Sequence, residues 1–172
     1  MSIDAQRILE DCRAIREQWA ADAAPTVKIK RIGDHDRPLP SYAREGDSGL
    51  DLSCVLQHKT LVLFGRGPHE QRFATVSCGF AFEIPPGYEG QVRPRSSLTS
   101  RGIIAHLGTI DSGYRGEVMV ILENRSSEDF VLRRGDRIAQ LVIAPVVRAA
   151  LSEVAELSAS ERGTGGFGST GK

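Results

Sequence analysis

The stretch ATVSCGFAFEIPPG (residues 74–87) decides the fold. Residues 74–84 have the composition of a β-strand, and Pro85-Pro86-Gly87 then predicts a turn. Similar short runs recur along the chain, separated by turn-rich segments at roughly eight- to twelve-residue spacing, which is typical of a sandwich, barrel or jelly roll. They occupy residues 26–32, 61–64, 91–93, 117–122, 130–132 and 138–146. We therefore expect an all-β protein.

The two ends of the chain differ from this β-rich middle. Residues 3–22 form an amphipathic pattern in which one helical face carries Ile8, Cys12, Ile15 and Trp19. We expect this helix to pack on the body or on another subunit; a weaker helical pattern covers 149–157. The organisation predicted is an N-terminal helical extension (1–25), a β domain (26–160) and a Gly-rich C-terminal tail (161–172).

Composition excludes several classes of protein. The chain has 22 Lys+Arg and 22 Asp+Glu, and this zero net charge argues against direct nucleic-acid binding through bulk charge. The three cysteines form no CxxC pair, so neither a disulfide framework nor a zinc site is expected. No apolar run is long enough to span a membrane, and the N-terminus lacks a secretory pattern. A cytoplasmic protein without membrane contact is expected.

The tail combines phosphate-binding and base-stacking residue types. Residues 166–172, GFGSTGK, match the G-x-x-x-x-G-K of a P-loop, but that motif needs a following helix, which we do not expect here. Consecutive Gly N–H groups with the hydroxyls of Ser169 and Thr170 can nevertheless wrap a polyphosphate. Arg162 adds a charged fork, and the ring of Phe167 suits stacking on a nucleobase. The alternative is a disordered tail in which Phe167 is incidental.

Five segments in order, including this tail, resemble the five motifs of the trimeric dUTP pyrophosphatases (dUTPases). They are AREGDSGLDL (43–52), RPRSSL (93–98), GTIDSGYRGE (108–117), GDRIAQL (135–141) and RGTGGFGSTG (162–171). The resemblance covers residues 26–172. It implies a jelly-roll, β-clip subunit and a homotrimer with active sites shared between subunits. The fifth motif would close over substrate held between the other two chains.

The resemblance also implies a reaction: hydrolysis of dUTP to dUMP and pyrophosphate, which keeps uracil out of DNA and supplies the precursor of dTMP. Asp111 matches the general base that activates water for attack on the α-phosphorus. An Asp on a Gly-bracketed turn is also a common turn former, which is the structural alternative. Tyr114 matches the residue that packs on the deoxyribose and excludes a 2′-hydroxyl.

Further site residues follow from the same resemblance. Arg95, Ser96 and Ser97, the last in place of the usual Gly, match phosphate contacts, as does Gln140. Asp51 matches a carboxylate that steadies Mg²⁺ through water, the metal being held mainly by the triphosphate. We expect Asp136 and Arg137 to form a structural ion pair. In the tail, the substrate contacts implied are Arg162, Phe167, Gly168, Ser169 and Thr170.

Uracil recognition departs from the family pattern. The family often has an Asn six residues before the catalytic Asp, where this chain has Ala105. Backbone groups around 106–109 would then read the base, helped by the His106 side chain. The uracil-side contacts expected are His106, Gly108, Thr109, Ile110 and Met119.

Two other functions remain open at this point. A dCTP deaminase shares the expected fold and an Arg-Ser-Ser-Leu segment, but it needs a Glu at the position of Ile121; Glu123 lies in another register. The other alternative is a dUTPase whose N-terminal helix binds a protein partner.

Overall fold

Buried and exposed side chains alternate along a central strand of this protein. In β8 (Glu117–Asn124), Val118, Val120 and Leu122 are buried, whereas Met119 and Ile121 between them are exposed. This period of two is that of a strand with one face on the core. The structure is a computed structural model that describes residues 24–67 and 72–164.

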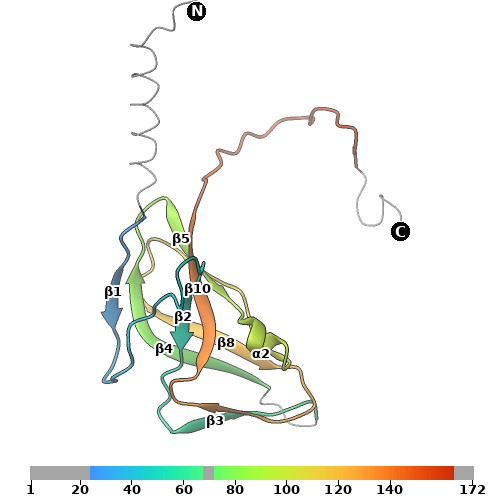
Figure 1. Cartoon of the computed structure of the whole chain (residues 1–172). Coiled ribbons are helices and arrows are strands. Elements are labelled where there is room, and N and C mark those ends of the chain that lie inside the picture. The colour runs from blue at the N-terminus through green and yellow to red at the C-terminus, as the bar shows by residue number, and fades with distance from the viewer. Residues whose placement is uncertain (1–23, 68–71, 165–172) are drawn as a thin grey trace, which may run out of the picture.

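The described residues form two four-stranded antiparallel sheets and one two-stranded sheet (Figure 1). The first sheet has the order β1-β4-β8-β6, the second β2-β10-β5-β7, and the third pairs β3 with β9. The other elements are β1 (Lys28–Arg31), β2 (Leu50–Ser53), β3 (Thr60–Leu63), β4 (Phe73–Glu83), β5 (Tyr88–Arg93), α2 (Ser96–Thr99), β6 (Ile103–Ala105), β7 (Gly108–Ile110), β9 (Phe130–Arg133) and β10 (Arg137–Pro145).

A single apolar core is enclosed by these sheets. Its fully buried side chains come from several elements, among them Leu52, Ile84, Ile103, Leu132 and Leu141. Burial of each such side chain contributes about 1.5–3 kcal/mol. The described residues also leave apolar side chains uncovered on the outer face of the first sheet, including Phe73, Met119 and Ile121.

Every strand predicted from the sequence is present, within a few residues. The sequence reading missed β2, β6, β7 and α2, which are only three or four residues long. Periodicity needs several repeats to be visible, so pairing with longer neighbours, rather than local pattern, defines these elements.

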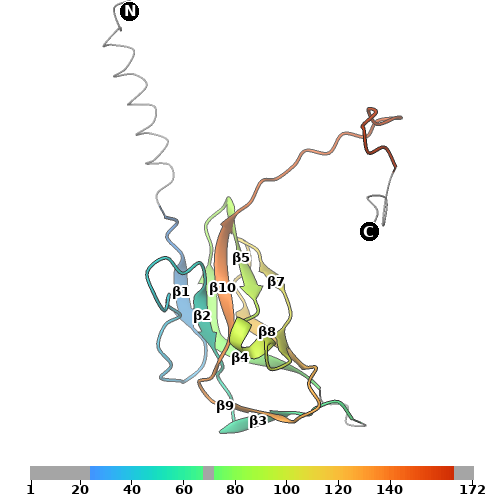
Figure 2. The same ribbon diagram turned by 45° about the vertical axis from the view of Figure 1, so that its right-hand side comes forward.

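The prediction of a helix over 149–157 is wrong. Residues 146–160 have no regular structure beyond a bend and are exposed throughout. This segment leaves the end of β10 and runs away from the sheets (Figures 1 and 2). Because the side chains of residues 149–157 stay exposed, no packing stabilises a helix there. The expected helix over 3–22 lies outside the described residues. Within the described ranges, no helix is long and apolar enough to cross a membrane.

Candidate active site

Asp51 is the centre of a polar pocket of about 510 Å³, which we call the arginine pocket. Arg95 donates from Nε to Asp51 Oδ1 at 3.0 Å, and Arg137 donates from Nη1 to Asp51 Oδ2 at 2.9 Å. One carboxylate thus orients two guanidinium groups in a partly buried setting, where such bonds are stronger than at the surface. The other lining residues are Ala43, Arg44, Asp47, Ser48, Gly49, Ser96, Ser97 and Gln140.

The expected pair between Asp136 and Arg137 is not formed. Arg137 pairs with Asp51 instead, while Asp136 Oδ2 accepts the backbone N–H of Arg133 at 2.8 Å. The Asp136 side chain therefore closes the turn before β10, as an Asp in a tight turn commonly does. The carboxylate that orients Arg137 comes from β2, far away in the sequence.

A β-bulge brings Arg137 and Gln140 into the same pocket. Residues three apart on a regular strand point to opposite faces, but the pairing of β10 with β2 shifts register between Arg137 and Ala139. Gln140 lies opposite Asp51 in this ladder and donates from Nε2 to the carbonyl of Pro94 at 3.0 Å. A Cβ on Gly49 would lie 2.7 Å from Gln140 Oε1, so the close approach depends on glycine.

Ser96 and Ser97 enter the arginine pocket at the start of α2. This single turn begins where the carbonyl of Arg95 accepts the N–H groups of Leu98 and Thr99, both at 3.0 Å. Leu98 is buried and fixes the turn on the core. Both serine side chains are exposed beside the Arg95 guanidinium, which suits them to bind an anion.

Asp111 lies in a different pocket, of about 570 Å³, which we call the Asp111 pocket. It is lined by Pro86, Gly87, Tyr88, Glu89, Ser112, Gly113, Val146 and Arg148. None of these residues lines the arginine pocket. Asp111 is exposed, and no contact within the described part of the chain engages its carboxylate. Within one chain, the predicted base and the predicted phosphate ligands therefore do not share a cavity.

Hydrogen bonds made by the residues that follow Asp111 hold the turn in place. The N–H of Tyr114 donates to the carbonyl of Asp111 at 3.0 Å, and the Tyr114 hydroxyl donates to the carbonyl of Glu117 at 3.1 Å. Any side chain on Gly116 would clash with the Tyr114 hydroxyl. The tyrosine ring thus lies over a glycine and remains 44% exposed, available to a ligand.

The expected uracil-side residues lie on an edge strand. β7, which contains Gly108, Thr109 and Ile110, pairs with β5 on one side and ends the sheet on the other. An edge strand presents unpaired N–H and C=O groups, so β7 has backbone groups for a planar base. Met119 is 41% exposed on β8 of the other sheet.

His106 has a partner that the sequence did not reveal. The His106 Nε2 atom lies 3.2 Å from Glu123 Oε2. The other carboxylate oxygen, Glu123 Oε1, accepts a hydrogen bond from Arg125 Nε at 3.1 Å and lies 3.8 Å from Arg72 Nη2. Burial opposes ionisation of Glu123, but Arg125 and His106 outweigh it and hold the pKa of this carboxyl below its usual range. A carboxylate held in these ion pairs is not suited to carry a proton to and from a substrate. Ile121, at the position where a dCTP deaminase needs a Glu, is apolar, so both residues argue against deaminase chemistry.

The remaining predicted contacts belong to the tail. Arg162 lies in a turn at the end of the extended segment. Phe167, Gly168, Ser169 and Thr170 lie outside the described residues.

The donor set argues against a metal held by the protein alone. Across the described ranges, no three His, Cys, Asp or Glu side chains gather as metal ligands. Asp51 accepts one hydrogen bond from each of two arginines. A carboxylate has about four acceptor positions, so Asp51 can still accept hydrogen bonds from water. The residues present therefore fit a cation carried by a ligand and reached through water.

Sequence reasoning missed Arg137 and Arg44 as pocket residues. Arg137 was visible in the fourth motif, but the bulge that turns it toward Asp51 leaves no trace in the local pattern. Arg44 lies in the first motif, seven residues before Asp51. This closeness in sequence was the signal that could have placed Arg44 in the same pocket.

Comparison with known proteins identifies relatives over most of the chain. A family model described as dUTPase matches residues 35–171. The deoxyuridine 5'-triphosphate nucleotidohydrolase of Anaeromyxobacter sp. (strain Fw109-5) is 53% identical over 152 residues, covering 86% of this chain and 98% of that protein. The enzyme of the same name from Anaplasma marginale (strain St. Maries) is 48% identical, with coverage of 84% and 97%.

A solved structure has the same fold. The Staphylococcus bacteriophage 80alpha dUTPase with dUPNHPP superposes with a TM-score of 0.75 at 27% identity, covering 87% of this chain and all of that one.

Proposed function

The chain belongs to the dUTPase family, and we propose that it hydrolyses dUTP to dUMP and pyrophosphate in a homotrimer with shared active sites. The observation that carries the proposal is the arginine pocket: Asp51 orients Arg95 and Arg137 beside Ser96 and Gln140, a donor set suited to a polyphosphate. The reaction would keep uracil out of DNA and supply the precursor of dTMP.

Shared sites are supported by the separation of the two pockets. A water activated by Asp111 must reach a phosphorus atom held by Arg95, but these residues line different cavities in one chain. Juxtaposing the Asp111 pocket of one subunit with the arginine pocket of another solves this problem. The exposed apolar side chains on the outer face of β4 and β8 supply a surface for such assembly.

The proposed chemistry divides between the two pockets. Asp111 takes a proton from water as it attacks the α-phosphorus, a positioned transfer that contributes about 10²–10⁴-fold. Arg95, Ser96, Ser97 and Gln140 hold the phosphates and stabilise the charge on the departing pyrophosphate. Mg²⁺ carried by the triphosphate would neutralise that charge, with Asp51 steadying its water ligands.

Substrate selection is assigned to the base and sugar contacts. The free edge of β7 reads the uracil through Gly108, Thr109 and Ile110, and His106 and Met119 are proposed as further contacts. Tyr114 packs on the deoxyribose and leaves no room for a 2′-hydroxyl. Arg162, Phe167, Gly168, Ser169 and Thr170 close over the bound nucleotide and exclude water. Cytoplasmic location and a protein partner for the N-terminal helix remain predictions.

The test is Asp111→Asn, assayed for pyrophosphate release from dUTP and for binding of dUPNHPP. We expect a loss of at least about 10²-fold in kcat with analogue binding retained, because the amide keeps the shape but cannot accept the proton. Ser112→Ala, one residue along the same turn, is the matched control and should stay active. Near-normal kcat in Asp111→Asn would overturn the assignment.

A further inference from the structure

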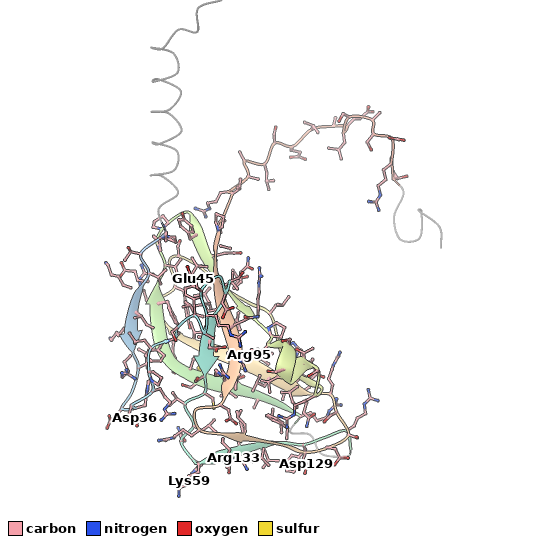
Figure 3. The ribbon with its side chains drawn as sticks, viewed as in Figure 1. Asp36, Glu45, Lys59, Arg95, Asp129 and Arg133 are labelled. Atoms are coloured by element: carbon pink, nitrogen blue, oxygen red, sulfur yellow. The ribbon has the colours of Figure 1, made fainter. Side chains whose placement is uncertain are left out.

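A second groove, of about 470 Å³, adjoins the arginine pocket. The two cavities share Arg95, Ser97 and Arg137, and the other charged residues along the groove are Arg101, Arg133 and Asp136. We call this cavity the exit groove. Figure 3 labels two of its lining residues, Arg95 near α2 and Arg133 on β9 below it.

The exit groove carries an excess of positive charge. The Arg101 guanidinium lies 5.0 Å from the centre of the Phe130 ring, a cation–π contact that orients it without neutralising it. The one acidic residue in the groove, Asp136, accepts the backbone N–H of Arg133. Among the described residues, the Arg101 and Arg133 side chains form no ion pair, whereas Arg95 and Arg137 are paired with Asp51. The groove thus adds two unpaired guanidinium groups and one carboxylate.

The charge balance changes along the path between the cavities. In the arginine pocket, Asp51 and Asp47 offset the charges of Arg95, Arg137 and Arg44. In the exit groove, Arg101 and Arg133 are added and only Asp136 opposes them. An anion released in the arginine pocket therefore meets a more positive electrostatic potential in the exit groove. A cleft lined by positive charges attracts anions.

We propose that the exit groove is a second anion site, which takes inorganic pyrophosphate as it leaves the arginine pocket. This proposal rests on the proposed function, which generates pyrophosphate beside Arg95. Arg95 and Arg137 line both cavities, so the anion exchanges one guanidinium partner at a time. Arginine's planar fork suits this transfer, because each group can bind two phosphate oxygens at once.

The experiment measures pyrophosphate binding while the substrate site is occupied. The full-length protein is saturated with dUPNHPP, and inorganic pyrophosphate is titrated in by calorimetry. We expect binding that weakens with salt, since the groove is open to solvent. Arg101→Gln and Arg133→Gln should each weaken it about fivefold. Lys30→Gln removes a positive charge on β1, outside the groove, and should bind as the wild type does.

Steady-state kinetics give a second measurement. Added pyrophosphate should inhibit dUTP hydrolysis less in Arg101→Gln than in the wild type, with unchanged kcat/KM for dUTP in its absence. Circular dichroism and oligomeric state would confirm that the variants fold.

Each outcome decides between the two proposals. If dUPNHPP binds and dUTP is hydrolysed, but pyrophosphate does not bind the loaded enzyme, the exit groove is overturned and the proposed function stands. The exit-groove proposal is also overturned if Arg101→Gln and Arg133→Gln both bind pyrophosphate as the wild type does. The same conclusion follows if Glu153→Gln, which changes the charge of the exposed segment after β10 and not of the groove, weakens pyrophosphate binding equally. Failure of dUPNHPP to bind would instead overturn the proposed function.

Discussion

Glu117 connects the Asp111 turn to the neighbouring strand β4. Its Oε1 accepts the Ser77 hydroxyl and the backbone N–H of Gly79 at 2.8 Å, within the register shift of β4 between Ser77 and Ala81. Gly79 has a φ of 73°, and a side chain there would clash with His35. The Glu117 carbonyl meanwhile accepts the Tyr114 hydroxyl. One residue thus supports both the bulge and the tyrosine.

Removing the Glu117 side chain should free the start of β8 from β4 and so shift the Glu117 carbonyl that holds Tyr114, without touching the phosphate ligands. We expect Glu117→Ala to lower the free energy of unfolding by about 1 kcal/mol, because the Gly79 N–H loses its shorter bond and keeps only the one to Ser77 Oγ at 3.1 Å. Discrimination between dUTP and UTP should fall at the same time. Glu117→Gln keeps an acceptor oxygen and is the control. If Glu117→Ala discriminates as the wild type does, Glu117 has no role in positioning Tyr114.

The elements of the first sheet meet at the buried carboxyl of Glu123. This residue of β8 lies opposite Phe73 of β4 and contacts His106 just after β6. Its pKa is lowered in the folded protein, so the carboxylate stabilises the fold at pH values above the unfolded value of about 4.3. That stabilisation is lost as the pH falls through the lower, folded pKa.

Glu123→Gln should remove this pH dependence. At pH 7 the variant should be less stable than the wild type by about 2 kcal/mol, since charged hydrogen bonds to Arg125 are lost. The difference should shrink below pH 4, where the wild-type carboxyl also becomes neutral. Denaturant unfolding between pH 7 and pH 3, at fixed protein concentration, measures it. A difference that stays constant across this range would contradict the role given to the carboxylate.

The C-terminal segment contacts the body of its own chain at its start, where the Val146 N–H donates to the Gly87 carbonyl at 2.8 Å. Residues 146–164 leave β10 as an exposed, extended chain, and its apolar side chains Leu151 and Leu157 are 96% and 89% exposed. Such a segment gains stability only when it meets another surface. This supports a tail that acts on a site beyond its own chain.

Deletion of residues 162–172 should leave the protein folded and nearly inactive. The core lies entirely within β1–β10, so the melting temperature should stay near that of the full chain. Pyrophosphate release from dUTP should fall by about 10²-fold or more, because closure over the substrate is lost. Arg162→Ala separates the contribution of the guanidinium from that of the Gly-rich part. Full activity of the truncated protein would remove the tail from the mechanism.

At the scale of the whole molecule, an exposed apolar face suggests how subunits meet. Phe73, Met119 and Ile121 are 52%, 41% and 48% exposed and lie on one face of the β4–β8 ladder. Adjacent apolar side chains of this kind commonly mark a protein contact. A homotrimer that covers this face would bury them.

Ile121→Glu should therefore dissociate the proposed trimer. The side chain is half exposed in one chain, so the subunit should still fold, but a buried carboxylate without a partner opposes assembly. We expect a smaller species by sedimentation and a parallel loss of dUTP hydrolysis, since the proposed juxtaposition of the two pockets would be lost. Ile121→Val keeps an apolar side chain and should remain trimeric. A trimeric, active Ile121→Glu enzyme would show that this face is not the interface.

The longer strands were predictable from the sequence, and the motifs were recognisable in it, because both are local. Strand-like composition between regularly spaced turns predicted β4, β8 and β10. The five motifs predicted roles for Asp51, Arg95 and Asp111. The three-residue strands β6 and β7 left no such pattern. Their existence depends on neighbours that are distant in the sequence.

The sequence by itself therefore determined which residue types this protein brings to its chemistry. Only the tertiary structure decided how they meet: Arg137 pairs with Asp51 rather than with adjacent Asp136, and Asp111 lies apart from Arg95. The physical reason is that register and bulges arise from pairing between remote strands, so a shift of one residue in β10 turns a side chain to the other face. No local pattern records that choice.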